Sequence, residues 1–196
     1  MMGSTIKLLG LASFNAFVAL ALSASYLTHY AGKMQTLSNE NVTAFVREFA
    51  GVTTGQRGDM DEHEMIGYFV THVSEGASFS TTVNSSMEGV SKPANKMRRK
   101  EFIASTLRTI RDKGPHPASV TVEDVKISGD GHEATAITTI NEKSALEFKN
   151  PADGEPGVSA VSATSYCNET VKLSNEHVIQ IQSETCTTTI APIDSF

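Results

Sequence analysis

Two stretches near the carboxyl end decide the fold: V-S-A-T-S-Y-C-N-E-T-V-K-L, residues 161–173, and V-I-Q-I-Q-S-E-T-C-T-T-T-I, residues 178–190. Both are rich in Thr, Val and Ile, the residue types that strands favour, and a short polar break at residues 174–177 separates them. The pattern predicts a long antiparallel hairpin. We expect the rest of the chain to pack onto the sheet that this hairpin begins.

The register of the hairpin follows from its apolar residues. Pairing Leu173 with Ile179, and Val171 with Ile181, brings apolar side chains together on one face of the sheet. This pairing implies a three-residue turn at residues 175–177.

The two cysteines of the chain, Cys167 and Cys186, lie one on each arm of this hairpin. The apolar register places Cys167 opposite Thr185, one residue short of Cys186. We therefore predict a disulfide together with one extra residue, a β-bulge, within residues 182–185. The alternative is a pair of reduced, buried cysteines that act as small hydrophobic residues.

The amino-terminal 33 residues differ from the rest. They contain no acidic residue, and residues 8–22 are almost entirely apolar behind Lys7. This composition predicts an N-terminal targeting or anchor helix, so the expected organisation is a signal peptide or membrane anchor at residues 1–33 and one domain at residues 34–196. A chain of 196 residues with 39% hydrophobic content supports a single domain of this size.

Cleavage and retention of this leader both agree with the sequence. Ala21 and Ser23 are small enough for a signal peptidase to cut before Ala24, whereas residues 8–27 are about as long as a minimal membrane-spanning helix. Lys7 favours a cytoplasmic amino end in either case. We expect the domain to be periplasmic or secreted, or tethered to the inner membrane by residues 8–27.

The charge of the chain argues against nucleic acid as a partner. The net charge is −6, and a domain with excess acid does not neutralise phosphates efficiently. The cations gather at Lys96, Arg98, Arg99 and Lys100, which we interpret as a solvated face at the start of a helix.

Three helices are expected before the long strands. The first begins after Ser38 or Asn39 and ends at Gly51, and the second runs from a capping box formed by Asp59 and Glu62 to Gly76. The third covers residues 96–113.

The strand pattern predicts five strands. A short edge strand is expected at residues 77–83, followed by a loop at residues 84–95. The next strands are expected at residues 119–127, with a bulge near Glu123 or Asp124, and at residues 132–148, ahead of the final hairpin. The order predicts an α+β fold: a cone-like, bent antiparallel sheet with three helices packed on one face.

This order of elements, with the tail C-N-E-T-V-K-L…V-I-Q-I-Q-S-E-T-C, resembles the nuclear transport factor two-like superfamily over roughly residues 38–192. The resemblance implies a sheet curled around a pocket that the helices close, and pairing of two copies through their sheets. Enzymes of the superfamily place a tyrosine and a carboxylate in the pocket, a pair suited to proton abstraction. Here the matching strand, residues 77–83, contains no acid, which counts against isomerase-like chemistry.

The catalytic candidates are Tyr68 and His72, which lie four residues apart and therefore on one side of the second helix. The alternative is a Tyr at a packing interface and a His facing solvent. Apolar residues expected to line a pocket are Met65, Phe69, Phe102 and Leu107.

Metal and cofactor binding are not expected. Residues 59–64, D-M-D-E-H-E, offer potential metal ligands, but a helix would spread them around its axis. Acids at this position instead favour the start of a helix, where the dipole is positive.

These features favour a non-enzymatic periplasmic or membrane-tethered domain that binds a small hydrophobic ligand or a partner protein, with a homodimer through the sheet. A second hypothesis is a small pocket enzyme of the isomerase, dehydratase or cyclase type that uses Tyr68 or His72. A third, which needs the leader as an anchor, is an assembly subunit of an inner-membrane secretion complex.

Overall fold

The computed structural model describes residues 35–87, 90, 92–114, 118–149 and 156–194. The predicted leader at residues 1–33 lies outside these residues. The described elements belong to one compact unit, Thr36–Phe196. Within the described residues, no helix is both long enough and apolar enough to span a membrane.

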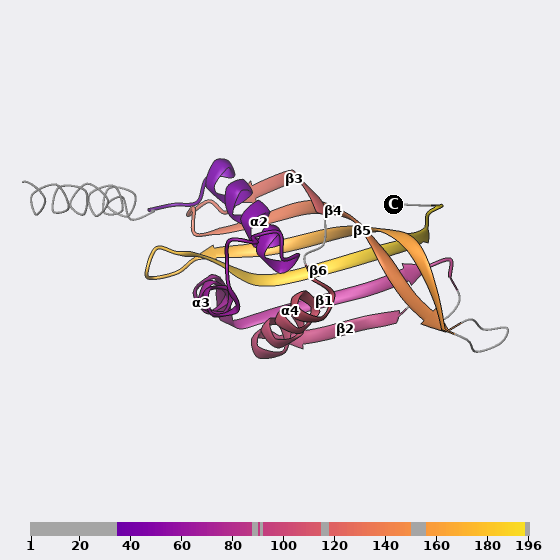
Figure 1. Ribbon diagram of the computed structural model, residues 1–196. Helices are drawn as coiled ribbons and strands as arrows, with labels where there is room; N and C mark the ends of the chain where they lie inside the picture. Colours follow the sequence, from indigo (N-terminus) through magenta and orange to yellow (C-terminus); the bar gives the residue numbers. More distant parts are fainter. Residues whose placement is uncertain (1–34, 88–89, 91, 115–117, 150–155, 195–196) are drawn as a thin grey trace, which may run out of the picture. The chain divides into compact units, whose positions relative to one another are not determined.

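The unit is an α+β fold in which helices cover one face of a six-stranded sheet (Figure 1). In chain order the described elements are α2 (Asn39–Thr53), α3 (Glu62–His72), β1 (Val73–Ser85), β2 (Lys92–Arg98), α4 (Arg99–Lys113), β3 (Ala118–Ile127), β4 (Glu133–Lys149), β5 (Pro156–Leu173) and β6 (Ile179–Pro192). The strand order is β2-β1-β6-β5-β4-β3. The α+β class is confirmed, but the sheet is mixed, because β1 runs parallel to β6.

The predicted hairpin is formed by β5 and β6. Cys167 pairs with Cys186, and the two form a disulfide, as predicted. Thr170 pairs with Ser183 and Val171 pairs with Ile181, so Gln182 is the extra residue. The predicted bulge is therefore confirmed.

The core lies between the helices and the sheet. Along β4 and β5 the residues that face the helices are buried: Ala134, Ala136, Thr138, Cys167, Glu169 and Val171. Helix α4 packs on β1 through Phe102, whose ring stacks on that of Phe79 with centroids 3.7 Å apart. Phe69 of α3, which is fully buried, meets the ring of Phe102 edge-on.

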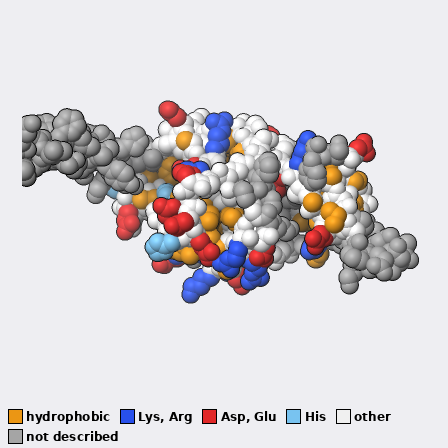
Figure 2. Space-filling view, in the orientation of Figure 1, with side chains coloured by type: hydrophobic (Ala, Val, Ile, Leu, Met, Phe, Trp, Pro, Cys, Tyr) orange, Lys and Arg blue, Asp and Glu red, His pale blue; other side chains and the backbone are white. Residues whose placement is uncertain are grey.

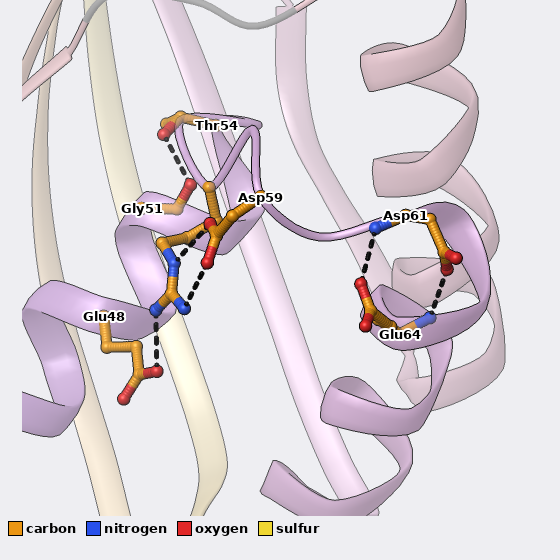
Figure 3. A network of polar contacts seen from close by, with 7 residues as sticks. Glu48, Gly51, Thr54, Asp59, Asp61 and Glu64 are labelled. Atoms are coloured by element: carbon orange, nitrogen blue, oxygen red, sulfur yellow. Dashed lines mark hydrogen bonds and ion pairs between the residues drawn. The ribbon is translucent and has the colours of Figure 1, made fainter. Parts of the chain in front are cut away.

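The start of α3 differs from the prediction. Its N-cap is Asp61, whose carboxylate accepts a hydrogen bond from the Glu64 backbone N–H, while the Glu64 side chain accepts one from the Asp61 N–H (Figure 3). The predicted cap, Asp59, instead accepts two hydrogen bonds from the guanidinium of Arg57, at 3.0 and 3.1 Å. This ion pair keeps Asp59 in the loop, so the capping box forms two residues later.

The ends of the first two helices also differ. Helix α2 continues past Gly51 to Thr53, where the hydroxyl of Thr54 bonds the Ala50 carbonyl at 2.8 Å. Helix α3 ends at His72, and β1 begins directly at Val73 rather than after Gly76. Pairing with the long strand β6 extends β1 in both directions beyond the predicted residues 77–83.

Strand β2 was not predicted. Its sequence, K-P-A-N-K-M-R, is polar and contains a proline, because the strand lies at the sheet edge and pairs only with β1. It occupies the end of the predicted loop and the first residues of the predicted third helix, so α4 begins at Arg99 rather than at residue 96. The predicted bulge in β3 is confirmed at Glu123, since Val122 and Asp124 pair with successive residues of β4.

The disulfide should contribute measurably to stability. Replacing both cysteines, as Cys167→Ser with Cys186→Ser, should lower the free energy of unfolding by about 2–4 kcal/mol, because the bond restricts the unfolded chain. Urea denaturation of the two oxidised proteins would measure the difference. A reducing agent should destabilise the wild-type protein and leave the double variant unchanged; an equal response of both would contradict the assignment.

Candidate functional site

Two carboxyl groups, those of Glu169 and Glu184, face each other inside the fold. They are direct cross-strand partners in the β5–β6 ladder, next to the paired cysteines along both strands. Side chains alternate along a strand, so Glu169 shares the helix-covered face with Cys167. On β6 the extra residue Gln182 shifts the alternation, which turns Glu184 toward the same face.

Glu169 is enclosed. It is 3% exposed, and its Oε1 accepts a hydrogen bond of 2.7 Å from the Thr138 hydroxyl of β4. Its other oxygen, Oε2, is buried without a hydrogen-bond partner in the described part of the chain. A buried polar atom without a partner costs about 1–3 kcal/mol, so this atom marks a place where a ligand group could bond.

Glu184 is less enclosed. It pairs with Phe79 of β1, and it lines a hollow of about 410 Å³ together with Phe79 and Met97. The other residues that line this hollow are Ser78, Ser80, Lys96, Arg98 and Thr185. Glu184 is thus the member of the pair that a solute can approach.

The interior changes the acidity of both carboxyl groups. Burial, with a further contribution from the neighbouring Glu184, raises the pKa of Glu169 to about 8, although the Thr138 hydrogen bond opposes this shift. Burial also raises the pKa of Glu184 to about 7. Near neutral pH the pair therefore holds a proton, and can both donate and accept hydrogen bonds.

Tyr68 and His72 lie together, as the spacing predicts, with ring centroids 4.5 Å apart. His72 is half-buried: its Nδ1 lies 2.9 Å from the carbonyl oxygen of Ile179, and its ring packs against Phe45. The Tyr68 hydroxyl is buried without a partner in the described residues, and burial raises the pKa of this hydroxyl. The charged groups that act on it are Glu48 and Arg57, on the α2 side.

The residues expected to line a pocket belong to the packed core. Met65, Phe69 and Phe102 are buried and Leu107 is half-buried. Phe102 is stacked between Phe79 and Phe49, with centroids 3.7 and 6.0 Å away. Their contribution to a ligand cavity stays a prediction.

The potential metal ligands have other partners. The Sγ atoms of Cys167 and Cys186 and a carboxylate oxygen of Glu184 lie within 4.8 Å of one another, but the disulfide leaves no thiolate to bind a metal. In the acidic run at residues 59–64, Asp59 bonds to Arg57, Asp61 and Glu64 form the capping box, and Glu62 pairs with Arg111 at 2.6 Å. These acids act at the start of α3, as the sequence indicates. Whether the chain binds a metal or a cofactor stays a prediction.

Sequence reasoning did not identify Glu169 and Glu184, because the search for an acid was confined to the first strand. The signal was present in the register. Once a bulge aligns Cys167 with Cys186, the residues two positions inward, Glu169 and Glu184, must pair on the same face.

Comparison with known proteins identifies the fold. No known protein-family profile and no curated protein sequence matches the chain. Among solved structures, a conserved protein from Planctomyces limnophilus superposes with a TM-score of 0.50 at 15% identity, covering 79% of this chain and 98% of its own. A type 2 hexachlorocyclohexane dehydrochlorinase, LinA, gives 0.50 at 7% identity, covering 81% and 95%.

An NTF-2-like protein of unknown function from Silicibacter pomeroyi aligns at 15% identity with a TM-score of 0.47, covering 78% and 99% of the two chains. The chain thus has the α+β fold of the Planctomyces limnophilus protein and of LinA. It is similar in fold to solved proteins described as NTF-2-like, as the element order implied. LinA is an enzyme, but a shared fold alone does not assign an activity to this chain.

The raised pKa values of Glu169 and Glu184 should make stability depend on pH. The folded chain retains protons on Glu169 and Glu184, whereas the unfolded chain releases them above pH 4.5, the ordinary pKa of a Glu carboxyl group. The free energy of unfolding should therefore fall as the pH rises from about 5 to 8, by up to about 1.4 kcal/mol per pH unit for each proton. Urea denaturation at several pH values measures this slope.

The variant Glu169→Gln keeps the shape of the side chain but cannot ionise, so its slope should be shallower. Glu147→Gln, at an exposed position of β4, is the matched control and should keep the wild-type slope. An unchanged slope in Glu169→Gln would refute the assignment of the buried proton.

Proposed function

We propose that this chain is a non-enzymatic binding domain that works outside the cytoplasm, either free in the periplasm or tethered by its leader. The disulfide supports an oxidising compartment, where such bonds persist. The apolar run at residues 8–22, with no acid among the first 33 residues, supports export.

The ligand that fits best is a small, mainly hydrophobic molecule with one hydrogen-bonding group. The observation that carries this proposal is the buried Glu169 carboxyl, whose Oε2 has no partner in the described chain. Apart from Glu184 and Thr138, its neighbours on this face are apolar: Ala136 lies opposite on β4 and Val171 two positions along β5. An apolar wall with a few polar groups that fix orientation is typical of small-molecule sites. The hollow beside Glu184 offers an approach to the pair.

Binding is favoured over catalysis because the two residues first considered as catalytic, Tyr68 and His72, make contacts that hold the fold together. The His72 ring nitrogen is 2.9 Å from the Ile179 carbonyl, which joins α3 to β6. Tyr68 lies between the Phe49 and His72 rings. Within the described residues, no contact joins Tyr68 or His72 to Glu169.

An acid–base enzyme is the second candidate, and the carboxyl pair itself favours it. Two adjacent carboxyl groups with raised pKa values can act as proton donor and acceptor, which isomerases and dehydratases require. The LinA structure shows that this fold supports a dehydrochlorinase in that protein, at only 7% identity.

A second copy of the chain is a further proposed partner, through the sheet face opposite the helices. Ile137 of β4 and Tyr166 of β5 are 40% and 57% exposed there. Their partners are Asn168 and Thr139, so the two side chains lie two positions apart along the ladder, on the same face. Light scattering over a range of protein concentrations should show a dimer that Tyr166→Lys weakens. A monomer at every concentration would exclude this pairing.

The ligand proposal is tested by native mass spectrometry of the protein purified from its own source. We expect a bound small molecule on the wild-type chain and on the control Glu147→Leu, and its loss from Glu169→Leu, which keeps side-chain volume but removes the polar group. Recovery of the same molecule unaltered after incubation supports binding, whereas its conversion by wild type but not by Glu169→Gln supports the enzyme. Equal occupancy in wild type and Glu169→Leu would refute the site.

A further inference from the structure

The positive charge of this acidic chain is concentrated in one segment. Residues 92–113, which form β2 and α4, contain eight of the 16 Lys and Arg residues and only two of the 22 acids. The rest of the chain therefore has eight basic and 20 acidic residues. Figure 2 shows several Lys and Arg side chains over the region of α4, with Asp and Glu side chains among them.

A groove lies beside these cations. Its volume is about 750 Å³, and it is lined by Val70 of α3, Glu75 and Gly76 of β1, and the start of α4 from Arg98 to Glu101 with Ile103. Val70 is 55% exposed, and Ile66, one turn earlier on α3, is 38% exposed. The groove thus combines the exposed Val70 and the half-buried Ile103 with three cations, which outnumber its two acids, Glu75 and Glu101.

The fold does not require all of these cations. The Arg99 guanidinium is structural: its Nη2 donates to the Val70 carbonyl at 2.6 Å and joins α4 to α3. The side chains of Arg98 and Lys100 are exposed, and within the described residues neither forms an ion pair. Cations near a helix N-terminus also oppose the helix dipole, so they do not stabilise α4.

We propose that this surface, formed by Ile66, Val70 and Ile103 with Arg98 and Lys100, docks onto an anionic phospholipid bilayer. The cations would bind lipid phosphates, and the exposed apolar side chains would enter the interface between head groups and acyl chains. Lys and Arg near an anionic bilayer each contribute favourably to binding, and apolar residues add to it.

The charge distribution selects a bilayer over other anionic partners. A nucleic acid gains nothing from exposed Ile and Val, and a long polyanion would also meet the acidic remainder of the chain. A planar bilayer can meet the basic face alone, because repulsion of the acidic remainder orients the domain. This inference is independent of the ligand site at Glu169 and Glu184.

The test uses the full chain with its disulfide intact, and flotation with vesicles of phosphatidylcholine alone or mixed with phosphatidylglycerol. The difference between the two vesicle types measures the contribution of anionic lipid, and the double variants below separate this surface from the basic leader. We expect stronger binding to the mixed vesicles, and a decline of this excess as salt is added.

The variant Arg98→Gln with Lys100→Gln should reduce the excess binding roughly tenfold or more at low salt. The matched control, Lys126→Gln with Lys143→Gln, removes the same charge from β3 and β4 and should retain it. Val70→Ser should reduce binding to the mixed vesicles without altering the salt dependence. Urea denaturation confirms that each variant is folded.

Three outcomes would overturn the proposal. The first is no preference for anionic vesicles, and the second is an equal loss of vesicle binding in the two double variants. The third is loss of the preference in inorganic phosphate at an ionic strength at which sodium chloride does not affect it. The last would mean that the cations bind a free anion rather than a bilayer.

Discussion

The extra residue Gln182 is the constraint on which the interior depends. A strand places successive side chains on opposite faces, so without an insertion Ile181 and Glu184 would point in opposite directions. With the insertion, Ile181, Glu184 and Cys186 all face the helices, opposite Val171, Glu169 and Cys167. The disulfide and the carboxyl pair are therefore two consequences of one bulge, because a regular hairpin with the same apolar pairs would form neither.

Sequence reasoning succeeded where a local pattern agreed with the tertiary fold. The apolar pairs of β5 and β6 set a register that required the bulge, and both the bulge and the disulfide were deduced from residues alone. It failed where distant contacts decided the outcome. Strand β2 has a polar sequence and forms at the sheet edge by pairing with β1. Arg57 withdraws Asp59 from the helix cap that its spacing to Glu62 suggested. The acid pair was overlooked for another reason: the search for a pocket carboxylate was confined to the first strand, residues 77–83, which the superfamily resemblance suggested.

The carboxyl pair is difficult to explain as a stabilising feature. Replacing buried ionisable groups by apolar residues of similar size is often neutral or stabilising by about 1–4 kcal/mol. Ala136, Val171 and Ile181 already surround the position with apolar side chains, so a Leu or Val at either Glu would continue the core. A sequence under pressure for stability alone would not retain two adjacent acids there, which is why they form the candidate site.

The neighbouring disulfide offers a physical reason why the hairpin tolerates this pair. Separating the two strands would let both carboxyl groups reach water and ionise, and burial makes that hydration favourable by several kcal/mol for each ion. A cross-link two residues away on the same face opposes such separation, and its typical contribution of about 2–4 kcal/mol is of the same order. The bond between Cys167 and Cys186 thus joins the two strands beside the carboxyl pair. The integrity of the disulfide and the preorganisation of the site are therefore coupled through this short part of the ladder.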